Sequence, residues 1–231
     1  MFSDRRDAGK KLATALEKYR GKNIVVIGIP RGGVVVAWEV ARHLRAPLDI
    51  VVIKKLGYPG NPELALGAAS PDHHYLNPEL ARTVPWDYID EELKTKQREA
   101  RERVELLKGS SKPVDLAGKT VIVVDDGVAT GASMIMALRV IREMKPTSIV
   151  IAIPVAPPDT VQQLKRHADE VIAVLQPTSF FVEVVTEWDY SIHSNGLSPA
   201  QRQRPRLARP CLALPNRSPR KSKCRRWRQL R

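Results

Sequence analysis

Residues 1–190 of this 231-residue chain contain no cysteine, and both cysteines, Cys211 and Cys224, lie near the carboxyl end. Disulfide bonds, cysteine-ligated metals and cysteine nucleophiles are therefore excluded from the first 190 residues. Long apolar runs are also missing, since no stretch approaches the ~18–20 residues of a membrane-spanning helix. The first ten residues are charged and lack the apolar segment of a secretory signal. We expect a soluble, cytoplasmic protein that makes no contact with a membrane.

Acidic residues are absent from residues 191–231, which hold 12 lysines and arginines. This tail supplies almost all of the formal charge of +13, because residues 1–190 hold 26 basic and 25 acidic side chains. Arginine, proline and serine dominate the tail, and neither a helical nor a strand period continues into it, so we expect it to be disordered on its own. It is either a non-functional extension or an arm that binds nucleic acid. The lack of interleaved aromatic residues favours the first interpretation.

The first 190 residues alternate short apolar runs with amphipathic segments. Strands are predicted at 23–29, 48–53, 120–124, 148–153 and 171–175, and helices at 3–19 (capped by Ser3), 33–44, 131–144 and 158–168. This alternation predicts an α/β fold with a doubly wound, mainly parallel sheet of about five strands, covered on both faces. We therefore expect one domain over residues 1–190, followed by the tail of residues 191–231.

Residues 57–112 interrupt the alternation and are expected to form an insert. Residues 57–63 are rich in turn formers, and residues 90–108 form a highly charged helical segment with few apolar positions. The composition fits a lid over a site and a solvated surface decoration equally well.

The strongest chemical signal is the run Val121-Ile-Val-Val-Asp-Asp-Gly-Val-Ala-Thr-Gly-Ala-Ser133. Four β-branched residues predict a buried strand, and two acids follow at its carboxyl end, where open α/β sheets bind ligands. The small-residue loop after them opens a helix, so its N–H groups can converge on an anion. Two carboxylates next to an anion site are expected to face sugar hydroxyls or a Mg²⁺ ion. The alternative is a simple Asp-Asp-Gly turn before a capped helix.

A second signal is the run Gly28-Ile-Pro-Arg-Gly-Gly33, which follows the first strand and opens a helix. Considered alone, it is equally well explained as an ordinary glycine-rich turn. Next to the Asp-Asp motif, it is better explained as a second anion-binding loop.

These two motifs resemble the type I phosphoribosyltransferases. In that family a strand followed by two acids and a loop rich in Thr and Gly binds ribose phosphate, and an Arg-Gly-Gly loop binds pyrophosphate. The chain is most similar to a less characterised bacterial branch through Lys55-Leu-Gly57, Pro59-Gly-Asn-Pro-Glu63 and Asp125-Asp-Gly-Val-Ala-Thr-Gly131. The resemblance covers about residues 3–190, and from Ser191 onward the sequence departs from that branch.

The resemblance implies roles for particular residues. Asp125 and Asp126 would hold the ribose hydroxyls and Mg²⁺, in part through water. The 5-phosphate would lie on Gly127, Val128, Ala129, Thr130, Gly131, Ala132 and Ser133, and pyrophosphate on Arg31, Gly32, Gly33, Lys54 and Lys55. The last two residues are expected to end the second strand, and solvated lysines explain them equally well. Phe180, Phe181 and Trp188 fall where the family builds the hood that covers the base, and are equally plausible as core.

The resemblance also implies an activity. The chain would transfer ribose 5-phosphate from 5-phosphoribosyl-1-pyrophosphate to a nucleobase or related nitrogen acceptor, with Mg²⁺ as cofactor, in nucleotide salvage. A homodimer and a strained or cis peptide in the Arg-Gly-Gly loop are further implications. Relatives that use 6-oxopurines often carry an aspartate general base where this chain has Ala129. We therefore expect poor turnover of guanine and hypoxanthine.

Two other functions stay open. The chain could be a non-catalytic sensor of ribosyl pyrophosphate that regulates RNA or DNA through its basic tail. It could also be a phosphatase or phosphorylase that uses the same phosphate loop. No motif in the sequence identifies the acceptor.

Overall fold

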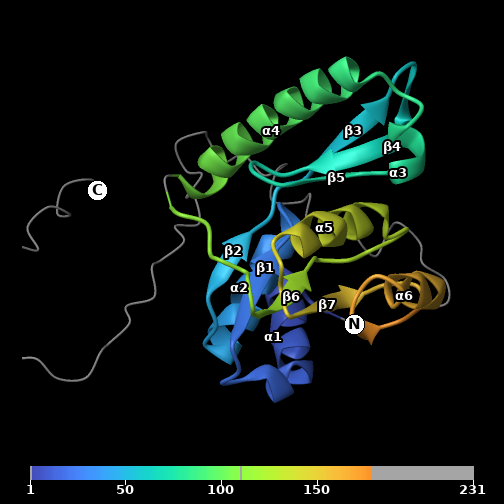
Figure 1. Ribbon diagram of the computed structural model, residues 1–231. Helices are drawn as coiled ribbons and strands as arrows, with labels where there is room; N and C mark the ends of the chain where they lie inside the picture. The colour runs from blue at the N-terminus through green and yellow to red at the C-terminus, as the bar shows by residue number, and fades with distance from the viewer. Residues whose placement is uncertain (1, 110, 178–231) are drawn as a thin grey trace, which may run out of the picture. The chain divides into compact units, whose positions relative to one another are not determined.

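The computed structural model describes residues 2–109 and 111–177 (Figure 1). Every described residue belongs to the first of the two units into which the chain divides, residues 1–196. None of the helices in these described ranges is both long enough and apolar enough to cross a membrane.

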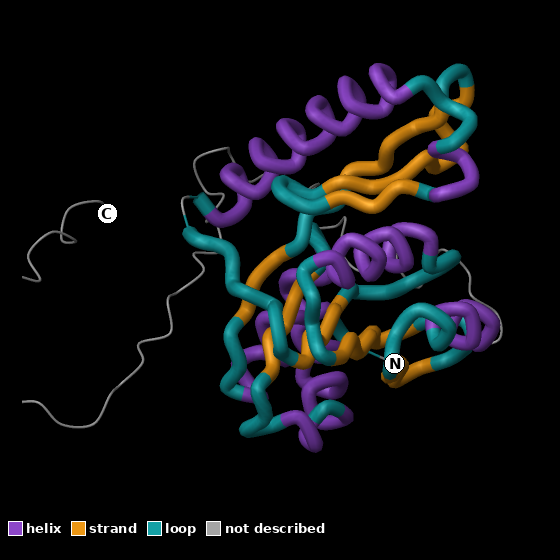
Figure 2. The backbone as a smooth tube through the Cα atoms, in the orientation of Figure 1, coloured by secondary structure: helices purple, strands orange, loops and turns teal. Residues whose placement is uncertain are grey.

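A parallel sheet of five strands forms the centre of the first unit (Figures 1 and 2). Its order is β2 (Leu48–Ile50), β1 (Ile24–Gly28), β6 (Thr120–Val124), β7 (Ser148–Val155) and β8 (Glu170–Leu175). All four neighbouring pairs are parallel. The predicted doubly wound α/β fold is confirmed, and the strand predicted at 120–124 has the observed bounds.

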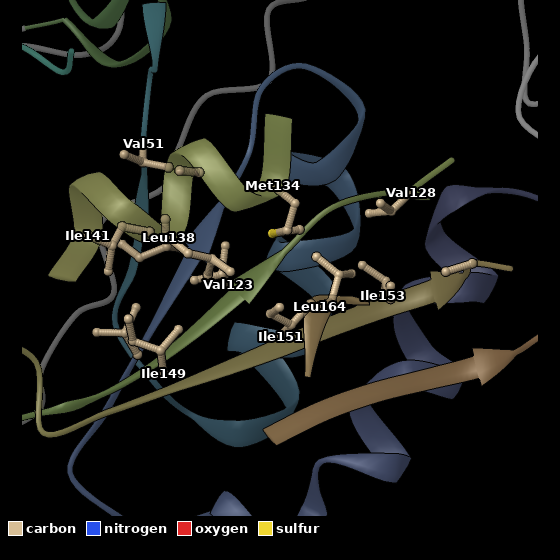
Figure 3. Close-up of a cluster of buried hydrophobic side chains, with 14 of the residues drawn as sticks. Val51, Val123, Val128, Met134, Leu138, Ile141, Ile149, Ile151, Ile153 and Leu164 are labelled. Atoms are coloured by element: carbon tan, nitrogen blue, oxygen red, sulfur yellow. The ribbon is translucent and has the colours of Figure 1, made fainter. Parts of the chain in front are cut away.

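Helices cover both faces of this sheet, so its strands are apolar on both sides. In β6, Val121 and Val123 pack in the core cluster that includes α5 (Ala132–Glu143) and Leu164 of α6 (Pro158–Leu164). The alternate residues Ile122 and Val124 pack in a second cluster with α1 (Arg5–Ala15) and α2 (Gly32–Leu44). Figure 3 shows the first cluster, in which side chains of α5 meet those of β6 and β7.

A second sheet, which the sequence did not predict, begins at Lys54, three residues before the predicted insert, and continues into it. Its three antiparallel strands are β3 (Lys54–Tyr58), β4 (Asn61–Ala69) and β5 (His74–Leu76). A short helix α3 (Pro78–Ala81) and the long helix α4 (Trp86–Lys108) follow. Helix α4 lies along this sheet, and α5 lies between the two sheets (Figure 1).

Several predicted boundaries were wrong. The strand predicted at 48–53 ends at Ile50, and Lys54 and Lys55 begin β3 instead of ending that strand. The first helix is capped by the Asp4 side chain, which accepts a hydrogen bond from the Asp7 N–H, and not by Ser3. That helix ends at Ala15 and a 3-10 turn, η1 (Glu17–Tyr19), follows it. The helix predicted at 158–168 stops at Leu164.

A buried ion pair ties the end of α4 to the parallel sheet. Lys108 Nζ lies 2.7 Å from Asp49 Oδ1, and both side chains are less than a tenth exposed. The other carboxylate oxygen of Asp49 accepts a hydrogen bond from the Val114 N–H at 2.7 Å. With its partners in place the charge of Asp49 is compensated, as a buried carboxylate requires. The pair fixes where the second sheet and α4 rejoin the first sheet.

Candidate active site

The two loops singled out by the sequence lie side by side at one edge of the parallel sheet. Strands β1 and β6 are neighbours, and each of them ends at the start of one of these loops. The Ile29 N–H also donates to the Val124 carbonyl at 2.9 Å, which extends the contact beyond the strands. Strand order reverses between β1 and β6, and α2 and α5 lie on opposite faces. Such a switch point opens a crevice at the carboxyl ends of the strands, where this class of sheet binds ligands.

Direct contact joins the glycines of one loop to the carboxylates of the other. A methyl group on Gly32 would lie 1.8 Å from Asp126 Oδ2. One on Gly33 would lie 2.8 Å from both Cα and Oδ1 of Asp125. Only glycine permits this approach, so the Arg-Gly-Gly and Asp-Asp segments form a single structural unit. Sequence spacing alone could not reveal the contact, because the segments are more than 90 residues apart.

Arg5 is a part of this unit that the sequence analysis missed. Its Nε donates to Asp126 Oδ2 at 2.8 Å, from the first turn of α1. A methyl group on Gly32 would lie 3.0 Å from the same nitrogen, so the guanidinium also adjoins the Arg-Gly-Gly loop. No motif surrounds Arg5 in the sequence, and only the packing of α1 brings it here. Its positive charge is placed to offset one of the two adjacent carboxylates.

The two carboxylates have different surroundings. Burial, together with the negative charge of Asp126, raises the pKa of Asp125 well above its ordinary value. The Asp126 N–H donates to Asp125 Oδ1 at 2.9 Å, which acts in the opposite direction. Asp126 instead has the guanidinium of Arg5 beside it. A cation next to the pair would therefore favour the charged form of Asp125.

Contacts with the rest of the fold hold the loop that follows the two carboxylates. The buried Val128 side chain packs in the core and its N–H donates to the Val155 carbonyl at 3.1 Å. Thr160 Oγ1 donates to the Ala129 carbonyl at 2.6 Å, which holds the middle of the loop from α6. Gly131 has a left-handed conformation with φ of 77° and begins α5 with no side-chain cap.

Ala129, Thr130, Ala132 and Ser133 are exposed along this loop. An uncapped helix start with no acid in its first turn is suited to bind an anion. Among the residues predicted to bind the 5-phosphate, Val128 differs from the others because its side chain packs in the core and its N–H donates to a backbone carbonyl.

The residues expected at the pyrophosphate loop are placed in two groups. Arg31 precedes α2, joined to Pro30 by a cis peptide bond as the resemblance implies, and Gly32 and Gly33 open the helix. Lys54 and Lys55 lie apart from them on β3, and each faces a carboxylate. Lys54 Nζ is 3.2 Å from Glu99, and Lys55 Nζ is 3.3 Å from Glu63.

The donor atoms present fit a Mg²⁺ ion that is shared with a ligand. Asp125 and Asp126 are partly exposed and offer carboxylate oxygens, which Mg²⁺ prefers. Within the described ranges, no group of three or more His, Cys, Asp or Glu residues is arranged to hold a metal. A Mg²⁺ ion here would therefore complete its shell with water and substrate oxygens, as it commonly does. The predicted hood residues Phe180, Phe181 and Trp188 lie outside the described residues.

Comparison with known proteins agrees with this geometry. The model of the phosphoribosyl transferase domain matches residues 5–191. Rv0571c of Mycobacterium tuberculosis strain H37Rv, named provisionally as a phosphoribosyl transferase, is 41% identical over 184 residues. That alignment covers 78% of this chain and 42% of the mycobacterial protein, so the chain spans less than half the length of that relative.

A solved structure is also similar. The crystal structure of TT1426 from Thermus thermophilus is 44% identical and superimposes with a TM-score of 0.72. The match covers 80% of this chain and 88% of that chain. Since the domain match includes both the Arg-Gly-Gly and the Asp-Asp loops, and the sequence identity and the superposition extend over most of the chain, the chain belongs to the type I phosphoribosyltransferase family.

Proposed function

We propose that the chain transfers ribose 5-phosphate from 5-phosphoribosyl-1-pyrophosphate to a nitrogen acceptor of the nucleobase kind, with release of pyrophosphate. The contact of Gly32 and Gly33 with Asp126 and Asp125 carries this proposal. It sets two anion-binding helix starts, those of α2 and α5, on either side of a pair of carboxylates. A ligand with a phosphate at one end, hydroxyls in the middle and a pyrophosphate at the other end matches that order.

Each part of the unit then has a task in the transfer. N–H groups at the start of α5, with Thr130 and Ser133, bind the 5-phosphate. Asp125 and Asp126 orient the ribose hydroxyls and stabilise positive charge that develops on the ring as the bond to C1 breaks. Arg31 and the start of α2 bind the leaving pyrophosphate, whose negative charge grows at the same moment. Arg5 positions Asp126 and touches no reacting atom in this scheme.

Mg²⁺ is the expected cofactor, held by Asp125 and Asp126 together with substrate oxygens and water. When bound, it would neutralise negative charge on the pyrophosphate and so make that group a better leaving group.

A second candidate is a sensor that binds ribosyl pyrophosphate without turnover and contacts nucleic acid. The acid-free composition of residues 191–231 favours this candidate. Lysine and arginine side chains can neutralise the phosphates of a nucleic acid, and the affinity that results depends on salt. The two candidates share the ligand and differ in catalysis.

Calorimetry of the full chain with ribosyl pyrophosphate and Mg²⁺ tests the shared part. We expect Mg²⁺-dependent binding that is weakened at least about tenfold in the double variant Asp125→Asn, Asp126→Asn. Asp90→Asn is the matched control, because Asp90 lies on α4 in a surface pair with Lys94. Equal affinity in a folded double variant would contradict the ribose role.

Pyrophosphate release with a panel of bases separates the two candidates. An enzyme releases pyrophosphate only when a suitable acceptor is added, whereas a sensor binds the ligand and releases none. A sensor is further expected to bind RNA or DNA with an affinity that falls steeply as salt rises.

A further inference from the structure

A cavity of about 830 Å³ lies between α5 and the antiparallel sheet. Pro30 of the Arg-Gly-Gly loop lines one part of it, and Ala132 and Ser133 at the start of α5 line another. The cavity therefore adjoins both anion-binding loops. Its volume is within the range of small-molecule sites. Residues of β3, β4, β5 and α4 also line it, and these elements belong to the interval of the chain that breaks the alternation of strands and helices.

The charged lining of this cavity is mainly cationic. Lys55, Arg103 and Arg139 contribute positive charge, and Glu63 is the one carboxylate in the described lining. Lys55 and Glu63 face each other at 3.3 Å and largely compensate one another. The guanidiniums of Arg103 and Arg139 have no such partner, since neither makes an ion pair with a carboxylate within the described ranges.

Arg139 is held in place by an aromatic ring. Its guanidinium carbon lies 4.5 Å from the centre of the Tyr75 ring, a cation–π contact between α5 and β5. This contact orients the side chain but leaves its planar N–H groups without an anionic partner within the described ranges. Other arginines on the same helices are used differently: Arg101 on α4 donates to the Pro71 carbonyl and lies near Asp72, and Arg142 on α5 donates to the His167 carbonyl.

We propose that this cavity binds the acceptor, and that Arg103 and Arg139 select an acceptor that carries a carboxylate. The inference rests on the proposed function, since it names the acceptor class for the same site. Two partly buried guanidiniums favour a planar anion, which each of them can bind through paired hydrogen bonds.

Equilibrium binding of matched probe pairs tests the proposal. The pairs are uracil with 6-carboxyuracil, nicotinamide with nicotinate, and aniline with 2-aminobenzoate, each measured with and without ribosyl pyrophosphate and Mg²⁺. For at least one pair, we expect the full chain to bind the carboxylated member about tenfold or more tightly than its partner. We expect that preference to fall to near equality in the double variant Arg103→Gln, Arg139→Gln.

Single variants and helix-matched controls keep the result interpretable. Arg103→Gln and Arg139→Gln alone are each expected to lose part of the preference. Arg101→Gln on α4 and Arg142→Gln on α5 remove the same charge outside the cavity lining and are expected to retain it. If Arg139→Gln unfolds the chain through loss of the Tyr75 contact, Arg103→Gln still gives the answer.

Three outcomes would overturn the proposal. They are a full chain that shows no carboxylate preference for any pair, a preference that survives the double variant, and a double variant that loses ribosyl pyrophosphate binding together with the preference. In the last case the arginines bind the donor's phosphates and not the acceptor. If the full chain fails to bind ribosyl pyrophosphate, the proposed function is wrong. In that case, the carboxylate preference measured without ribosyl pyrophosphate still tests whether Arg103 and Arg139 select a carboxylate.

Discussion

At the scale of single residues, Gly32 and Gly33 differ in what an added methyl group would meet. On Gly32 it would meet the end of the Asp126 side chain, which can rotate away. On Gly33 it would meet the Asp125 Cα at 2.8 Å and the Val124 carbonyl at 2.9 Å, which are backbone atoms. A methyl group at Gly32 is therefore expected to affect ligand binding, whereas one at Gly33 is expected to affect stability.

We expect Gly32→Ala to fold with nearly unchanged stability but to bind ribosyl pyrophosphate at least about tenfold more weakly, because Asp126 is displaced from Arg5. Gly33→Ala is expected to lower the free energy of unfolding by about 1–3 kcal/mol, because the backbone must shift. Urea unfolding and calorimetry on both variants check this. Gly32→Ala with full affinity, or Gly33→Ala with full stability, would contradict the contacts described.

Ala129 carries a prediction about the acceptor. Its exposed side chain lies in the loop between β6 and α5 and has no ionisable group. We expect slow or absent pyrophosphate release with guanine and hypoxanthine, since general acid–base assistance is typically worth ~10²–10⁴-fold. Ala129→Asp is expected to raise that rate, and Ala129→Asn, of similar size but without a titratable group, is not. Rapid turnover of guanine by the unaltered chain would refute the argument.

At the scale of secondary-structure elements, a charged cluster links the start of β8 to η1. Glu170, at the start of β8, accepts hydrogen bonds from Lys18 Nζ and Tyr19 Oη, both at 2.5 Å. The hydrogen bond from Lys18, followed by that from Tyr19, lowers the pKa of Glu170 below its ordinary value of 4.5. A carboxylate whose pKa is lower in the folded chain stabilises that state above the unfolded-state pKa, and the effect is lost as pH falls through the folded-state pKa.

We therefore expect Glu170→Gln to lower the free energy of unfolding by about 1 kcal/mol at pH 7, a modest value because the site is about one-third exposed. The difference between variant and unaltered chain should shrink as pH falls below about 4.5. Urea titrations at several pH values measure it. Glu102→Gln, on the exposed side of α4, is the control and should show no such pH-dependent difference. A Glu170→Gln difference that is constant down to pH 3 would argue against the cluster.

The elements also show which sequence patterns were informative. The strand predicted at 120–124 was right because β6 is central, and four consecutive apolar residues are needed to fill both faces. Strands β3 and β4 were missed because their residues include Gly57, Pro62 and Gly67 and half of β4 is exposed. Strand propensity depends on packing partners, and those partners come from α4 and α5.

At the scale of the whole molecule, the part of the chain that the structure describes already contains three apolar clusters. The five parallel strands and their two apolar clusters lie within residues 2–177, and a third cluster supports the antiparallel sheet. Residues 197–231 contain basic but no acidic side chains. A cationic segment without apolar periodicity has little to add to such a core.

Removal of residues 197–231 is therefore expected to shift the melting temperature by less than about 4 °C, which corresponds to roughly 1 kcal/mol in a chain of this size. Affinity for ribosyl pyrophosphate should be unchanged. Differential scanning calorimetry and ligand titration on the shortened chain provide the measurements. A larger drop would show that the tail packs on the first unit.

The class of sheet, the pair of carboxylates and the two loops that we propose to bind anions could all be found from the sequence alone. These features depend on local chemistry: β-branched runs predict buried strands, glycines permit tight loops, and adjacent acids at a strand end have few structural uses. The packing of Gly32 and Gly33 against Asp126 and Asp125, the ion pair of Arg5 and the cavity shared by Arg103 and Arg139 became visible only in the folded chain. The residues brought together in this way lie between about 36 and 121 positions apart in the sequence, and their neighbours are set by how helices and sheets pack, which no local pattern encodes.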